Sequence, residues 1–117
     1  MSYSEDKFVL ISKMKNFILE SEILFQNIPR RDLYNRDSLR KDMTEILRLI
    51  YLANNIRNDK QLKIKYQLDI CSRLSMLDFY LERAFIFEYI NDKQLYTYSK
   101  NLEEIIKITK GWMKKSE

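Results

Sequence analysis

The amino-acid sequence predicts an all-α fold, and three observations support that prediction. Glycine and proline each occur once in 117 residues and histidine is absent, although an average chain of this length holds roughly fourteen glycines and prolines together. Apolar residues recur three and four positions apart through most of the chain, which is the period of a helix that buries one side. Turn or capping residues interrupt this period at three places. We therefore expect residues 1–117 to form one domain, an up-down-up-down four-helix bundle.

The first helix is expected from about Ser4 to Asn27. Pro29 ends it, because proline lacks an amide hydrogen and pushes the preceding residue to extended angles. The polar stretch from Pro29 to Asp37 is predicted to be the longest loop of the chain. The buried stripe of this helix comprises Leu10, Met14, Phe17, Ser21, Leu24 and Ile28.

The second helix is expected to begin at Asp37 or Ser38 and to end near Asn58, with Leu39, Met43, Ile46, Ile50 and Ala53 on one stripe. The pentapeptide Asn-Asp-Lys-Gln-Leu occurs at 58–62 and again at 91–95. Asn followed three positions later by Gln resembles a capping box, so both copies indicate helix starts. An internal duplication is the alternative, although the flanking residues do not repeat.

The fourth helix shows the cleanest period of the chain. Lys100, Lys107 and Lys114 fall on the side opposite its buried seam and are expected to face water. The seam comprises Leu95, Tyr98, Leu102, Ile105, Thr109 and Trp112.

The third helix is apolar on more than one side. From Leu74 to Ile90, twelve of seventeen residues are apolar or aromatic, whereas a bundle helix needs only about three or four per two turns. We expect part of it to contact another copy of the chain; scattered exposed aromatic residues are the alternative. The candidate interface residues are Met76, Phe79, Tyr80 and Phe87, together with Gly111 of the fourth helix, where another backbone could approach closely.

The composition excludes most catalytic chemistry. Without histidine, neither Cys71 nor any serine has its usual base, and a ferritin-like di-iron site cannot form. The carboxylate pairs, such as Asp78 with Glu82, are interpreted as solvated helix surface. We expect a protein that is not an enzyme and holds no cofactor and no metal. The lone cysteine and the absence of a leader or a long apolar run indicate a cytoplasmic protein without a membrane segment.

A net charge of +4 permits an anionic partner. The basic residues gather in the first loop and at the end of the fourth helix, and an ion-paired, solvated loop is the alternative because Asp32, Asp37 and Asp42 lie among the arginines. A ring of identical subunits would add up the positive excess. The candidate nucleic-acid-binding residues are Arg30, Arg31, Arg36, Arg40, Lys41, Arg73, Arg83, Lys107, Lys110 and Lys114.

Two segments resemble a known family. They are Asn27-Ile28-Pro29-Arg30-Arg31 and Ile108-Thr109-Lys110-Gly111-Trp112-Met113-Lys114. They resemble the Avd family, the accessory variability determinants of diversity-generating retroelements, and the likeness extends over about residues 20–115. The same four-helix superfamily includes proteins encoded in intervening sequences of bacterial ribosomal RNA genes.

The resemblance implies a non-catalytic protein that forms a barrel-shaped homopentamer. It also implies association with a reverse transcriptase and with RNA or DNA during mutagenic copying of a template. Asp78 and Glu82 occupy positions where family members often carry basic residues, so the first loop and the helix-four lysines are expected to carry more of any RNA contact. The alternative is a structural or protein-interaction oligomer of the intervening-sequence type, with no nucleic-acid role.

Overall fold

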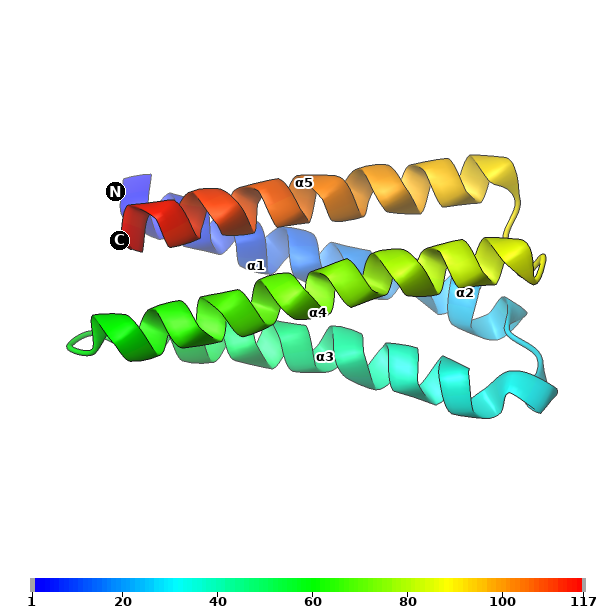
Figure 1. Ribbon diagram of the computed structural model, residues 1–117. Coiled ribbons are helices and arrows are strands. Elements are labelled where there is room, and N and C mark those ends of the chain that lie inside the picture. Colours follow the sequence, from blue (N-terminus) through cyan, green and yellow to red (C-terminus); the bar gives the residue numbers. More distant parts are fainter. Residues whose placement is uncertain (1, 117) are drawn as a thin grey trace.

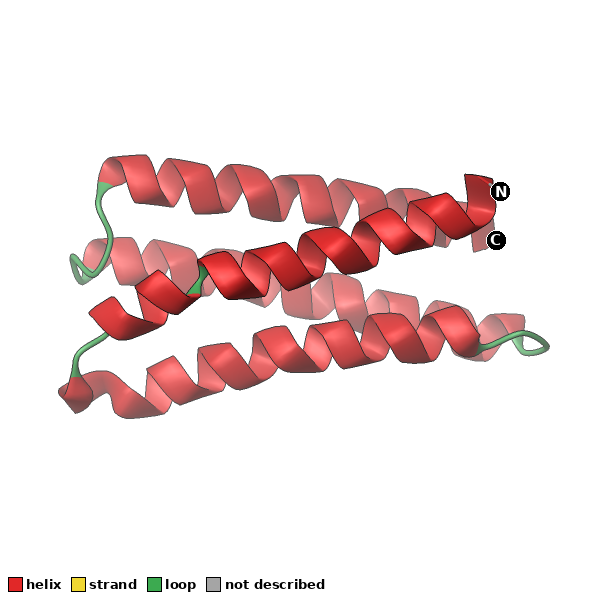
Figure 2. Cartoon of the chain, turned by 180° about the vertical axis from the view of Figure 1, so that it is seen from behind, coloured by secondary structure: helices red, strands yellow, loops and turns green. Residues whose placement is uncertain are grey.

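The computed structural model describes residues 2–116, so Met1 and Glu117 of the predicted domain lie outside the described residues. The described residues form helices joined by short connections and contain no strand (Figure 2). The elements are α1 (Ser2–Glu20), α2 (Glu22–Asn27), a 3₁₀ helix η1 (Arg30–Asp32), α3 (Leu33–Asn55), α4 (Lys60–Ile86) and α5 (Asp92–Ser116). Because α2 continues α1, the chain has four helical rods (Figure 1).

The four rods run up, down, up and down, as the sequence predicted (Figure 1). The α4 helix packs against α3 and α5, and α1 packs against the same two helices. Therefore α1 and α4 lie diagonally across the bundle. Both chain termini and the α3–α4 turn lie at one end, whereas the connection through Pro29 and the α4–α5 turn lie at the other (Figure 1).

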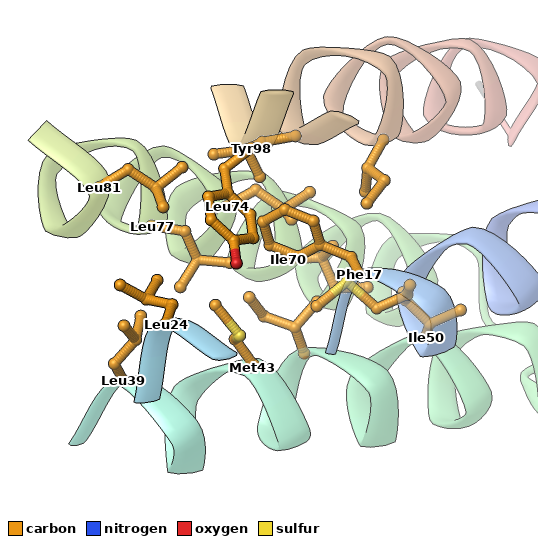
Figure 3. Close-up of a cluster of buried hydrophobic side chains, with 14 of the residues drawn as sticks. Phe17, Leu24, Leu39, Met43, Ile50, Ile70, Leu74, Leu77, Leu81 and Tyr98 are labelled. Carbon is orange, nitrogen blue, oxygen red and sulfur yellow. The ribbon is translucent and has the colours of Figure 1, made fainter. Parts of the chain in front are cut away.

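One apolar core runs through the bundle, and each rod contributes one stripe of side chains to it (Figure 3). Phe17 and Tyr98 meet edge to face, with ring centroids 6.4 Å apart. The Tyr98 hydroxyl donates a hydrogen bond of 3.1 Å to the carbonyl of Glu20, so its polar atom is satisfied. Leu95 is only partly buried, but the other residues of the predicted stripes are buried.

The expected first helix is divided at Ser21 and begins at Ser2 rather than Ser4. The buried Ser21 hydroxyl donates a hydrogen bond of 2.7 Å to the carbonyl of Phe17, one turn earlier. Such bonding to the preceding turn tends to bend helices. Backbone hydrogen bonds still connect Ser21 with Phe17 and with Phe25, so α2 extends α1 after a local irregularity.

The predicted loop from Pro29 to Asp37 is wrong in its second part. Helix α3 begins at Leu33, so Asp37 lies inside the helix and is not its N-cap. The start is earlier because Asp32 is bound by side chains from distant parts of the chain, described below, and these contacts hold the polar stretch in helical form. The predicted end of this helix near Asn58 is also wrong, because α3 ends at Asn55.

The repeated pentapeptide caps its two helices differently. At the second copy the predicted capping box is confirmed: the Gln94 amide donates 2.8 Å to the Asn91 side chain, and the Asn91 amide donates 2.9 Å to the Gln94 side chain. At the first copy the N-cap is Asp59 rather than Asn58, and its carboxylate accepts a 2.9 Å hydrogen bond from the Leu62 amide. A carboxylate competes well for this position, because it also favours the positive end of the helix dipole.

The α4 helix ends in a left-handed residue that is not glycine. Glu88 has a φ of 64°. The amide of Tyr89 donates 2.8 Å to the Ala84 carbonyl and that of Glu88 donates 2.9 Å to the Phe85 carbonyl, which is the Schellman pattern that glycine usually completes. With the one glycine placed inside α5, Glu88 adopts this conformation at a steric cost.

Replacing Glu88 with glycine is expected to raise the free energy of unfolding by about 1 kcal/mol, because glycine adopts a positive φ without strain. Urea denaturation followed by circular dichroism measures this difference. Glu82→Gly is the matched control: this exposed glutamate lies inside α4, where glycine should cost about 1 kcal/mol. A loss of stability in Glu88→Gly would show that the Glu88 side chain contributes more than its backbone strain costs.

Candidate interaction surfaces

The side of α4 that faces away from the core carries large apolar side chains. The core side is completely buried and includes Leu74, Leu77 and Leu81. On the opposite side Ser72 and Ser75 are exposed among the apolar residues. We call the following five residues the outer α4 face: Leu68 (54% exposed), Met76 (48%), Phe79 (54%), Ile86 (65%) and Phe87 (52%).

Three of the candidate interface residues, Met76, Phe79 and Phe87, are therefore exposed in the single chain. Tyr80 is half-buried, and its burial together with the nearby Asp42 and Tyr34 raises the pKa of its hydroxyl. Gly111 lies on an exposed side of α5, and a Cβ added there would meet no atom within 4 Å. Its part in assembly stays a prediction.

A polar cluster joins the start of α3 to the end of α4. Arg83 donates two hydrogen bonds to the carboxylate of Asp32, of 2.8 and 3.3 Å. The Tyr89 hydroxyl donates a third, of 2.8 Å, and the Asn35 side chain donates a fourth. The side chains of Asp32 and Arg83 are only 12% and 26% exposed. We call these four residues the Asp32 cluster.

The electrostatics of the Asp32 cluster follow from these contacts. The hydrogen bonds from Arg83 and Asn35 hold the pKa of the Asp32 carboxyl well below its usual range, despite the opposing effect of burial. The bond to Asp32 raises the pKa of Arg83, and burial followed by the same carboxylate raises the pKa of Tyr89. Both partners of the ion pair therefore stay charged over the physiological range.

Arg83 has a structural role in the Asp32 cluster that the sequence did not indicate. Its guanidinium carbon also lies 4.5 Å from the centre of the Phe87 ring, a cation–π distance. Asp32 and Arg83 are 51 positions apart, so no local spacing links them. A phosphate that binds Arg83 would have to displace its guanidinium from Asp32 and from the Phe87 ring.

The other arginines singled out from the sequence are mostly paired. Arg36 contacts Asp37 at 3.4 Å and Arg73 contacts Asp69 at 3.0 Å. Arg40 lies 3.4 Å from Glu22 and its guanidinium carbon lies 4.8 Å from the centre of the Phe25 ring. Arg30, Arg31 and Lys41 are exposed. The contacts of the arginines near Pro29 thus largely support the alternative of an ion-paired, solvated surface.

The lysines of α5 lie at the opposite end of the bundle from this arginine group (Figure 1). Lys107, Lys110 and Lys114 are exposed. The first turns of α4 lie beside them: the Gln67 side chain donates 3.0 Å to the Ser116 hydroxyl, and the ammonium of Lys63 lies 6.0 Å from the centre of a Trp112 ring. Lys60, Lys63 and Lys65 therefore belong to the same end.

Sequence reasoning missed these three lysines of α4. The available signal was topological, because antiparallel neighbours joined by a short turn place the start of one helix against the end of the other. The half of the bundle that holds the start of α1 and the end of α5 comprises residues 2–14, 44–73 and 104–116, with twelve basic and six acidic residues. The other half has nine basic and ten acidic residues. We call the first the basic half.

In the described part of the chain no three His, Cys, Asp or Glu side chains form a group suited to a metal ion. Within residues 2–116 no helix is long and apolar enough to span a membrane. Cys71 is a half-buried free thiol in α4, and burial raises its pKa. Comparison with family models, with curated proteins and with solved structures gave no match. The architecture and surfaces define an all-α four-helix protein.

Asp32→Asn is expected to lower the free energy of unfolding at pH 7 by about 2 kcal/mol, because it leaves Arg83 without its charged partner. The pKa of Asp32 is lowered in the folded state, so the carboxylate stabilises the fold above its unfolded pKa of about 4. That stabilisation is lost as the pH falls further, and the difference between wild type and variant should narrow below about pH 4.

Urea denaturation at pH 7 and at several acidic pH values measures this difference. Asp37→Asn is the control, since the exposed contact of Asp37 with Arg36 should contribute less than about 0.5 kcal/mol. Equal effects of the two substitutions would contradict the account of the Asp32 cluster.

Proposed function

We propose that this chain is a non-catalytic accessory protein that self-associates through the outer α4 face and helps the reverse transcriptase of a diversity-generating retroelement handle its RNA template or cDNA. The observation that carries the proposal is the outer α4 face. It is a row of large exposed apolar side chains on a helix whose opposite side already completes the core.

Self-association is favoured because clustered apolar surface gains roughly 25 cal/mol for each Å² removed from water. Exposed apolar residues are ordinary when scattered, whereas contiguous patches mark interaction sites. Four of the five residues of the outer α4 face lie within α4, and the fifth, Phe87, is the C-cap residue of the same helix. The number of subunits, five by the resemblance, is tested by the mass of the assembly in solution.

The role beside a reverse transcriptase comes from the resemblance of the Pro29 and Gly111 segments to the Avd family. A basic excess in one half of the bundle is compatible with it. Lysine and arginine would neutralise phosphates without reading bases, as suits a protein that accompanies copying of variable sequence. The absence of histidine from the sequence is in keeping with a binding role.

The function is tested by binding of the purified chain to a structured RNA at several salt concentrations, and by co-purification with the reverse transcriptase encoded beside it. Salt-sensitive RNA binding and co-purification would support the proposal. If the purified chain shows no salt-sensitive binding to structured RNA and does not co-purify with the reverse transcriptase, the proposal is wrong. A gene neighbourhood with a reverse transcriptase and two near-identical repeats that differ at adenines would support it independently.

A structural oligomer of the ribosomal-RNA intervening-sequence type is the second candidate. It is favoured by the acidic Asp78 and Glu82, both exposed on α4, and by the ion pairing of Arg36, Arg40 and Arg73. An assembled protein that shows no salt-dependent RNA binding would select this alternative, because phosphate contacts require a steep salt dependence.

Replacing both Phe79 and Ile86 with serine is expected to convert the assembled protein into a folded monomer, because it removes the apolar centre of the outer α4 face. Sedimentation velocity measures the mass, and circular dichroism verifies the helix content. Leu19→Ser with Tyr96→Ser is the matched control, since these residues are 68% and 66% exposed and belong to other helices. The control should sediment like wild type. If the Phe79/Ile86 variant does so too, the outer α4 face is not the contact.

A further inference from the structure

We propose that any contact with the phosphate backbone of RNA is made by the α5 lysines of the basic half rather than by the arginines near Pro29. The surface consists of Lys107, Lys110 and Lys114, which we call the lysine surface. This inference rests on the proposed function and deepens it by assigning the partner to one end of the bundle.

The arginine group near Pro29 offers little uncompensated charge. Arg83 is bound by Asp32, Arg40 contacts Glu22, and Arg36 contacts Asp37. The half of the bundle that contains them has nine basic and ten acidic residues. A polyanion approaching this half meets no net attraction, because opposite charges within a few ångströms of one another largely cancel at a distance.

The lysine surface carries more positive than negative charge. Lys107, Lys110 and Lys114 are exposed, and none of the three forms an ion pair with another described residue. Three acids of this half are engaged elsewhere: Asp59 caps α4, Asp69 pairs with Arg73 and Glu104 pairs with Lys13. Glu103, one turn before Lys107, is the nearest acid on α5 without such a contact among the described residues. The starts of α1 and α4 and the ends of α3 and α5 lie at this end of the bundle (Figure 1). Their opposite helix dipoles cancel, so the charged side chains determine the electrostatic potential there.

The spacing on α5 fits a phosphate backbone. Lys107, Lys110 and Lys114 are three and four positions apart, so they share one side of the helix. From first to last they span about 10 Å along the axis at ~1.5 Å per residue, which corresponds to the axial rise of about three nucleotides of one strand. Lysine ammonium groups on flexible stems contact phosphates as point charges and do not select bases.

The same surface is poorly suited to a lipid bilayer. Stable binding of a helix to a membrane surface combines basic residues with apolar side chains that insert among the lipids. Along α5 the one large hydrophobic residue that is strongly exposed is Tyr96, in its first turns and far from Lys107 to Lys114. The end of α5 therefore presents charge without an apolar anchor, which favours a nucleic acid.

The test compares two triple variants that remove the same charge. Lys107→Gln, Lys110→Gln and Lys114→Gln together alter the lysine surface, and Arg30→Gln, Arg31→Gln and Arg36→Gln together alter the arginine group. Binding to one fluorescent RNA hairpin is measured by anisotropy from 50 to 300 mM salt. The lysine variant should lose at least tenfold in affinity at 0.1 M salt, and its slope of log affinity against log salt should fall by about 2 to 3.

The arginine variant should keep its affinity within about threefold of wild type. Circular dichroism and sedimentation must show both variants folded and assembled like wild type. Tight wild-type binding that the arginine variant loses and the lysine variant keeps would overturn the lysine surface while leaving the proposed function intact. Absence of wild-type binding to RNA, with or without binding to vesicles containing phosphatidylserine, would overturn both.

Discussion

A four-helix bundle buries only one stripe of each helix, and this limit decides which side chains of the chain remain exposed. The α4 helix fills its share of the core with Leu74, Leu77 and Leu81, which are completely buried. The side chains of its outer face stay exposed among the described residues, although Phe79 and Ile86 are as apolar as the residues inside. The excess of apolar residues in α4 therefore links the fold to the proposed assembly, since one helix serves both.

The Asp32 cluster determines the shape of the bundle end next to this face. It ties η1 and the start of α3 to Arg83 and Tyr89. Arg83 also packs over Phe87, and Phe87 stacks on Tyr89 with ring centroids 6.0 Å apart. One partly buried carboxylate thus orders the end of the outer α4 face. The basic half lies at the other end, and the outer α4 face reaches into it at Leu68, whereas Lys107, Lys110 and Lys114 lie on α5.

The sequence predicted the features that depend on local spacing. The buried stripes, the exposure of Phe79 and Phe87, and the capping box at Asn91 are confirmed, because helical period and capping chemistry act within a few residues. Features set by distant contacts were missed. The early start of α3 depends on the bonds to Asp32, and the grouping of Lys65 with Lys114 depends on which helix ends meet. At Asn58 two adjacent capping residues competed, and the pattern could not rank them.

The accessibility of Met76 in solution shows whether another subunit covers the outer α4 face. In the single chain Met76 is 48% exposed, whereas Met14 and Met43 are completely buried. Oxidation by dilute peroxide, followed by peptide mass spectrometry at micromolar protein concentration, gives the rate at each methionine. If the outer α4 face is covered by another subunit, Met76 oxidises about as slowly as Met43 in the wild-type assembly and rapidly when the protein is diluted to monomers. Rapid oxidation of Met76 in the wild type at every concentration, with Met43 protected, would show that nothing covers the outer α4 face.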